Sequence, residues 1–377
     1  PMNFLDKFRY SFDNLNELSV TKNQSTETKA NYINPQLKSL LSMSVKVTPE
    51  IFPRVAEAID QVFDRLKIKN NFNFFITSNH LQTQALCAMM PQSTNAEIII
   101  TSKMIDLLNS KELQSVIGHE VSHFYYQHSL YPNPNQARNK AEFLNLLHLS
   151  RAAEISSDRA GFLGSGSLEH SLRSMLKITS GLGDEHLQFN FSSYLNQLRE
   201  LAEVKGDQTQ LYSTHPTFLN RMQALIWFSM SHEYHEFFET SKKGVYDLKT
   251  VDQKINESIK KVTGNELDVS NKEIIDRSLL FGALWIYLGD KKFSKQEQEK
   301  FTKRFGNKTT VSILGLLNIS NMPIIEKKVM SAYAEASILL KSDREKIIKE
   351  LKEIYQGVDE HSEDTKQNFE RLIKILN

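Results

Sequence analysis

The stretch NSKELQSVIGHEVSHFYYQH, residues 109–128, decides how this chain folds around its chemistry. Asn109 followed three residues later by Glu112 is the pattern of a capping box, so a helix is expected to begin here and to run to about His128. Apolar residues recur through the stretch at helical spacing. The sequence therefore predicts a mostly buried helix.

This predicted helix carries a group of polar residues that suits a metal. His119 and His123 are four residues apart, which places them on one helix face about 5–6 Å apart, within reach of one zinc ion. Glu120 lies beside the first histidine and can reach a zinc-bound water, whose pKa the metal lowers toward ~7. Three such residues on a buried helix are costly unless they are paired or bind metal. The pattern predicts a zinc hydrolase with Glu120 as general base.

A catalytic zinc site needs a third protein ligand. The long metzincin pattern would place a histidine six residues after His123, but that residue is Ser129. Two glutamates remain: Glu142, at a spacing that resembles thermolysin-like enzymes, and Glu154, which has Asp158 one turn later on the same face. A metal-bound histidine usually donates its other ring N–H to a carboxylate, and Asp158 could supply that carboxylate. Glu154 is therefore favoured over Glu142 as the third ligand.

Two further blocks follow the histidine pair in order. They are RAAEISSDRAG at residues 151–161 and STHPTFLNRM at residues 213–222. The three blocks together resemble peptidase family M48, which includes the HtpX-type heat-shock peptidases and the CAAX prenyl endopeptidases, and the resemblance covers roughly residues 45–240. It implies a gluzincin-type metalloprotease domain, mostly helical with a small sheet.

The resemblance also implies a ligand set and a mechanism. One Zn²⁺ per chain would be bound by His119, His123 and Glu154, and Glu120 would be the general base for peptide-bond hydrolysis. The substrate would be a protein or peptide, in extended or misfolded segments. The strand expected at Glu97 to Thr101 could pair with such a segment through main-chain hydrogen bonds.

Three more residues receive roles from the resemblance. Asp158 would orient a zinc-ligating histidine. His215 would line the site, where it would either stabilise the oxyanion or bind the zinc in a resting, closed state. Arg221 would also line the site, or would serve as a structural ion-pair partner of Asp158 or Glu154.

The rest of the chain predicts an α+β fold in two domains, residues 2–250 and an all-helical domain at residues 251–377. A short helix is expected over residues 2–18, and a turn over Gly161 to Gly166. The other main elements are expected as strands at 71–77, 84–89 and 97–101 and as helices at 49–67, 136–162, 167–181, 190–204, 216–240, 274–288, 295–305, 312–317, 324–340 and 343–355. Residues 279–297 faintly resemble TerB-like helical domains.

Composition narrows the class of protein further. The 377 residues hold 46 Lys and Arg against 45 Asp and Glu, so the net charge of +1 gives no argument for a nucleic-acid partner. The single cysteine, Cys87, favours a reducing compartment, and we expect a cytoplasmic protein. No signal peptide and no transmembrane segment are expected from the sequence. Its oligomeric state is not predicted.

Two alternative functions stay open. The first is a zinc-containing binding or chaperone-like protein whose peptidase activity is latent or absent. The second is a small-peptide aminopeptidase, which needs an acidic anchor for the substrate amine that the sequence does not identify. Cys87 is interpreted as an inert apolar residue and His128 as a packing or surface histidine.

Overall fold

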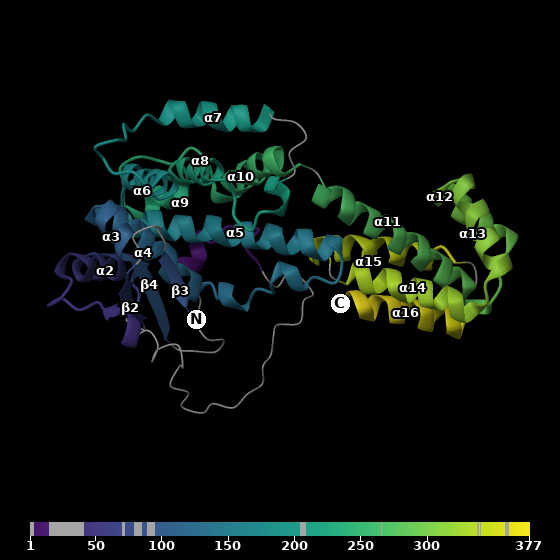
Figure 1. Ribbon diagram of the computed structural model, residues 1–377. Helices are drawn as coiled ribbons and strands as arrows, with labels where there is room; N and C mark the ends of the chain where they lie inside the picture. Colours follow the sequence, from purple (N-terminus) through teal and green to yellow (C-terminus); the bar gives the residue numbers. More distant parts are fainter. Residues whose placement is uncertain are drawn as a thin grey trace. The chain divides into compact units, whose positions relative to one another are not determined.

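The structure is a computed structural model that divides the chain into two compact units (Figure 1). It describes residues 4–14, 41–69, 72–78, 85–88, 95–203, 209–264, 266–337, 339, 341–358 and 362–377. Unit 1 comprises Pro1–Asp13, Lys22–Asn133 and Leu146–Gly264, and unit 2 comprises Asn14–Thr21, Pro134–Asn145 and Asn265–Asn377. Each unit has its own hydrophobic core and is described by itself.

Unit 1 contains a small mixed sheet. Its strands are β1 (Val45–Lys46), β2 (Phe72–Thr77), β3 (Ala85–Ala88) and β4 (Ala96–Thr101), in the order β1-β2-β4-β3. The parallel pair is β2 with β4, and the other two pairs are antiparallel. The three predicted strands are confirmed. The expectation that residues 97–101 could pair with an extended substrate is wrong, because β4 lies between β2 and β3, and β3 is the outer strand on that side of the described sheet.

Helix α4 (Ser110–Tyr125) begins as its sequence predicts. The Asn109 side chain accepts the Glu112 backbone N–H at 3.0 Å, and the Glu112 carboxylate accepts the Asn109 N–H at 2.9 Å. Helix α2 (Pro53–Leu66) packs its buried stripe of apolar residues against α4, although it starts four residues later than expected. A short helix α3 (Ser102–Leu107) joins β4 to α4. The sheet and α2 thus hold α4 in the core.

Helix α5 (Lys140–Ser165) lies against α4 through a glycine contact. A Cβ at Gly161 would lie 2.4 Å from the Ser115 carbonyl oxygen, so only glycine allows the two backbones to approach this closely. The predicted turn at Gly161 to Gly166 is therefore wrong. The glycine serves helix packing, and the helix continues through Ser165.

The remaining helices of unit 1 cover the same core. They are α6 (Leu168–Ser180), α7 (Phe191–Glu203), α8 (Phe218–Ser229), α9 (His232–Phe237) and α10 (Leu248–Thr263). The helix expected over 216–240 is interrupted, because the Ser231 side chain caps a new helix. The helix expected over 2–18 is wrong for the described residues, where only Phe4–Phe8 form a 3-10 turn, η1. Residues 15–18 lie outside the described part.

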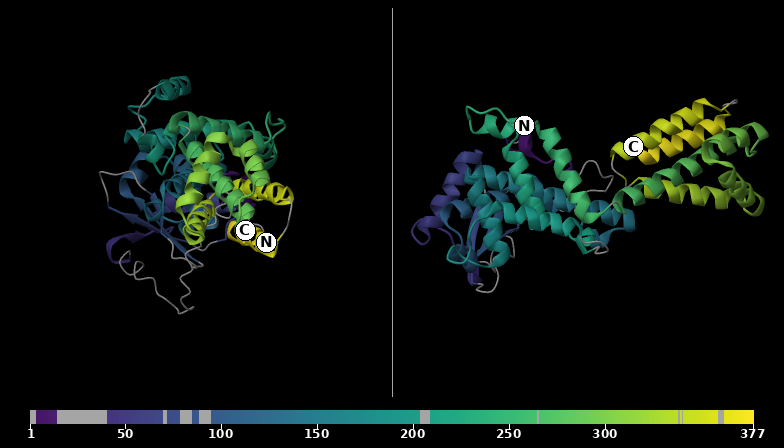
Figure 2. Two further views of the ribbon diagram at one scale, coloured as in Figure 1. Left: turned by 90° about the vertical axis from the view of Figure 1, so that its right-hand side faces the viewer. Right: turned by 90° about the horizontal axis from the view of Figure 1, so that it is seen from above.

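Unit 2 is helical throughout its described C-terminal part. It contains α11 (Glu266–Tyr287), α12 (Lys295–Phe305), α13 (Asn307–Ile319), α14 (Met322–Ala336), α15 (Lys341–Gln356) and α16 (Glu363–Leu376). Figure 2 shows α15 and α16, in yellow, side by side, and both contact α11. The predicted α+β class, mostly helical with a small sheet and a helical C-terminal region, is confirmed.

The predicted domain boundary after residue 250 falls inside α10, whose buried Val251, Ile255 and Ile259 belong to the core of unit 1. The assignment of two domains stays a prediction, because compactness alone does not test independent folding. No helix among the described residues has the length and apolar content needed to cross a bilayer.

Candidate metal centre

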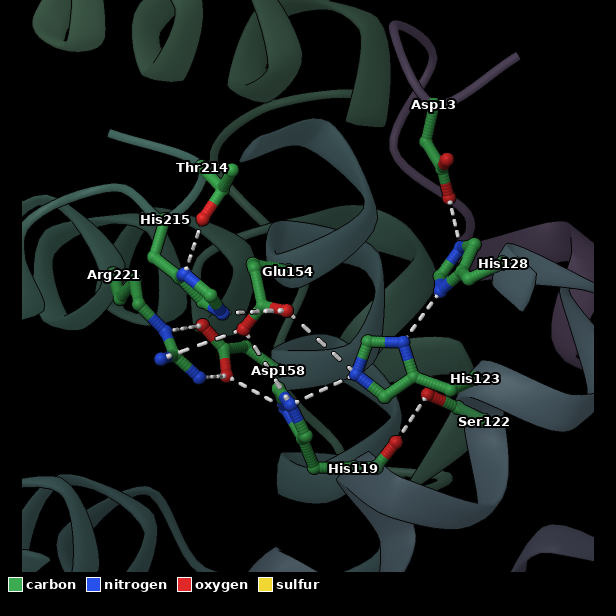
Figure 3. Close-up of polar contacts among 10 residues, drawn as sticks. All are labelled: Asp13, His119, Ser122, His123, His128, Glu154, Asp158, Thr214, His215 and Arg221. Atoms are coloured by element: carbon green, nitrogen blue, oxygen red, sulfur yellow. Dashed lines mark hydrogen bonds and ion pairs between the residues drawn. The ribbon is translucent and has the colours of Figure 1, made fainter. Parts of the chain in front are cut away.

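Helices α4 and α5 bring three potential metal ligands together (Figure 3). The Nε2 atoms of His119 and His123 lie 3.1 Å apart on α4. Glu154, on α5, places Oε2 3.6 Å from His119 Nε2 and Oε1 3.7 Å from His123 Nε2. The close approach of the two helices at Gly161 and Ser115 positions this glutamate opposite the histidines.

The spacing of the two imidazole nitrogens and the two Glu154 oxygens fits a tetrahedral zinc ion. Zinc binds nitrogen and carboxylate oxygen at about 2.0–2.1 Å, so two ligand atoms at a tetrahedral angle lie roughly 3.3–3.4 Å apart. The observed separations of 3.1, 3.6 and 3.7 Å surround that value. Two imidazoles and one carboxylate are also the donor set of known catalytic zinc sites, which keep one position open. The residues present therefore fit zinc.

Glu120 lies beside this cluster on α4 and is buried. Burial raises the pKa of its carboxyl group, and the negative charge of Glu154 raises it further. The backbone N–H of Cys87, on strand β3, donates to the carboxylate and holds it in place. A carboxylate that is buried, oriented and more basic than usual is suited to accept a proton.

His119 is supported from its other ring nitrogen. Its Nδ1 lies 3.0 Å from Oδ1 of Asp158, on α5. Arg221, on α8, donates two hydrogen bonds to the same carboxylate, at 2.7 and 2.6 Å, and lies 3.5 Å from Glu154. Burial alone would raise the pKa of Asp158, but Arg221 and His119 lower it to about 2. Asp158 is thus ionised and can only accept hydrogen bonds.

The two histidines differ in their electrostatic surroundings. Burial, together with the positive charges of His119 and Arg221, lowers the pKa of His123, so this ring stays neutral and keeps a lone pair for a metal. Burial would also lower the pKa of His119, but its hydrogen bond to Asp158 and the charge of Glu154 raise it. The carboxylates of Asp158 and Glu154 would also attract a metal cation, so the charge of the centre favours metal binding.

His215 approaches the cluster from the segment between η5 (Thr209–Tyr212) and α8. Its Nε2 lies 3.6 Å from Glu154 Oε1, and its side chain is 62% exposed. The buried guanidinium of Arg151 donates to the carbonyl oxygens of Leu211 and Ser213, at 3.2 and 2.8 Å. Arg151 therefore ties the His215 segment to α5. Arg151 stands in the RAAEISSDRAG block, but no local pattern indicated that it would contact the His215 segment.

The competing ligand and the single cysteine have other partners. Arg138 donates three side-chain hydrogen bonds to the Glu142 carboxylate, and its backbone N–H donates a further one at 2.6 Å. Glu142 is buried, and among the described residues the group that could hold a metal contains Glu154 instead. Burial and the charge of Glu120 raise the pKa of Cys87 to about 12, so its thiol stays protonated.

A cleft of about 620 Å³ opens onto the centre. One part of its lining is polar and comprises the candidate site residues, and another part is apolar. The apolar part includes Met104, Val116, Met175 and Ile178, and the β3 residues Ala85 and Cys87 also line the cleft. The site residues named from sequence thus share one cavity with the edge strand.

Comparison with known proteins points to one peptidase family. Residues 49–145 match the model of peptidase family M48. The matched stretch contains His119, Glu120 and His123 but ends before Glu154, so the choice of Glu154 as a candidate third ligand rests on the geometry above.

Part of the chain is similar to a curated plant protein. The chain is 25% identical over 169 residues to plastoglobule-localized metallopeptidase 48, chloroplastic, of Arabidopsis thaliana. The match covers 39% of this chain and 49% of that protein, so the chain spans about half the length of this relative. No solved structure gives a significant match.

Proposed function

We propose that this protein is a zinc-dependent endopeptidase that binds one Zn²⁺ per chain and hydrolyses peptide bonds of extended or misfolded protein segments. The observation that carries the proposal is the meeting of His119, His123 and Glu154 beside the buried carboxylate of Glu120 in an open cleft. The M48 match of this region supports it.

Each residue has a distinct task in this mechanism. Zinc, when bound, would act as a Lewis acid that polarises the scissile carbonyl, and it would lower the pKa of the attacking water so that the water loses a proton easily. Glu120 accepts the proton of the attacking water and can deliver it to the leaving amine. Its burial and the Cys87 N–H keep it aimed into the cleft.

Three other residues support the reaction. Asp158, fixed by Arg221, orients His119 so that its Nε2 faces the metal position. His215 is close enough to the cluster to donate a hydrogen bond to the developing oxyanion. The alternative role of His215, binding the metal in a resting state, would give the latent protein named above.

The cleft favours an extended substrate. Strand β3 has β4 as its partner in the described sheet, and its residues Ala85 and Cys87 line the cavity on the other side. A peptide can add to such an edge through main-chain hydrogen bonds, which do not depend on side-chain identity. We therefore assign substrate pairing to β3. The single cysteine is compatible with a reducing compartment such as the cytoplasm.

The test compares the wild type with Glu120→Gln, and uses Glu142→Gln as a matched control outside the metal-ligating group. The zinc content of each protein and its cleavage of an unfolded protein are measured. We expect one zinc per chain in all three proteins and a loss of cleavage of about 100-fold or more in Glu120→Gln alone, because a general base contributes that much. Full zinc with equal cleavage in wild type and Glu120→Gln would overturn the mechanism.

A further inference from the structure

The second proposed zinc ligand, His123, contacts a further histidine. His123 Nδ1, the ring nitrogen that faces away from Glu154, lies 2.7 Å from Nδ1 of His128. The other nitrogen of His128, Nε2, lies 2.9 Å from Oδ2 of Asp13. Figure 3 shows these three side chains as one line of contacts leading from the metal centre to the N-terminal segment. We call them the Asp13–His128–His123 chain.

Its outer members are buried and fully engaged. The Asp13 side chain is 0% exposed and that of His128 is 6% exposed. Asp13 also accepts hydrogen bonds from Arg9 Nε, at 3.1 Å, and from the hydroxyl of Tyr131. Burial alone would raise the pKa of Asp13, but His128 and Arg9 lower it to about 2. Asp13 is therefore an ionised group that accepts every hydrogen bond it makes.

The two contacts match the hydrogen bonds that a zinc-binding His123 needs. A His123 that binds zinc through Nε2 carries its hydrogen on Nδ1, and His128 Nδ1, at 2.7 Å, is the atom placed to accept it. His128 then carries its own hydrogen on Nε2, which it donates to the Asp13 carboxylate. His123 then has its own lone pair on Nε2, the atom that faces His119 and Glu154. This is the tautomer that can bind a metal.

The backbone is shaped to bring His128 to this place. Helix α4 ends at Tyr125, and Gln127 adopts a left-handed conformation with φ 57°, which a residue with a side chain rarely does. His128 then starts the 3-10 turn η3 (His128–Leu130) beside His123. The N-terminal segment is anchored to the same unit, since the Tyr126 hydroxyl donates to the Leu5 carbonyl at 2.9 Å.

We infer that His128 and Asp13 are positioning residues for the zinc ligand His123, and that they hold its Nε2 in the metal-binding tautomer through two successive hydrogen bonds. The inference rests on the zinc binding proposed above. It concerns the affinity for the metal rather than the hydrolytic step. The effect of such hydrogen-bond partners on metal affinity is typically about 10–100-fold.

The test measures the affinity of the full chain for Zn²⁺ by competition with a chelator of known affinity. His128→Ala removes the acceptor for the His123 N–H. His128→Gln restores an amide that can accept from His123 and donate to Asp13. His170→Ala is the matched control, because His170 is a partly buried histidine whose Nδ1 bonds Ser167 at 2.8 Å, and it is not among the residues that line the cleft.

We expect His128→Ala to bind Zn²⁺ about 10–100-fold more weakly than wild type, and His128→Gln to recover most of that loss. His170→Ala should bind as wild type does. The melting temperature of each zinc-free protein shows whether it is folded. Wild-type affinity in folded His128→Ala, or no recovery in folded His128→Gln, would overturn the inference. Normal zinc affinity with no peptidase activity in the wild type would instead count against the proposed function.

Discussion

The two histidines proposed to bind zinc are one helical turn apart on α4, yet they are supported from different parts of the molecule. His119 is held directly by Asp158, on the helix that also carries the proposed third ligand, and Arg221 donates hydrogen bonds to that carboxylate. His123 is held through a second histidine, and the carboxylate behind it comes from the N-terminal segment. Asp158 thus contacts His119 directly, whereas Asp13 supports His123 through two successive hydrogen bonds.

The difference shows how a site is encoded. Glu154 and Asp158 lie four residues apart, so one helix supplies a ligand and the support of another ligand with a fixed spacing. The support of His123 depends on the way the chain turns after α4 and on the docking of a segment more than a hundred residues earlier. The first can be recognised as a motif, whereas the second exists only in the folded chain.

The largest effect is expected from removing a ligand. Glu154→Ala should lose zinc, because it takes away one of three protein ligands, and its loss should exceed the roughly 10–100-fold expected for a supporting residue. Glu142→Ala should keep wild-type zinc affinity, since Glu142 is engaged by Arg138. Zinc content after dialysis distinguishes the two variants. Retention of zinc by Glu154→Ala and its loss by Glu142→Ala would reverse the ligand assignment.

Smaller effects are expected from substituting the two carboxylates that support the histidines. Asp158→Asn should weaken Zn²⁺ binding about 10–100-fold, because this carboxylate contacts a ligand itself. Asp13→Asn should weaken binding by about tenfold or less, because it acts through His128 and its amide oxygen can still accept. Both affinities come from chelator competition on the full chain. A larger loss for Asp13→Asn than for Asp158→Asn would show that the longer support matters more.

Much of the fold and site could be predicted from local patterns. The capping box at Asn109 and Glu112 is found as expected, because it depends on residues three apart. The same holds for the three predicted strands and for helix α12 in unit 2, which spans Lys295–Phe305 as expected. The proposed ligands of α4 also share a face for local reasons, since residues four apart do so in any helix.

What the sequence missed depends on contacts between distant parts. In a helix that ran to His128, this residue would lie about 140° around the axis from His123, so no interaction was expected. The helix ends earlier, and the left-handed Gln127 brings the two rings together. Likewise Gly161 suggested a turn, whereas its role is to let α5 approach α4. Which strand lies at the edge depends on the order of the strands in the sheet. The alternation of apolar and polar residues along a strand does not give that order.

The central claim is that His119, His123 and Glu154 bind one zinc ion, and X-ray absorption at the zinc edge tests it most directly. Protein loaded with one Zn²⁺ per chain should show nitrogen and oxygen neighbours at about 2.0–2.1 Å, with outer scattering from two imidazoles. Glu154→Ala should change this spectrum or bind no zinc. A sulfur neighbour at about 2.3 Å, or a spectrum unchanged in Glu154→Ala, would contradict the account.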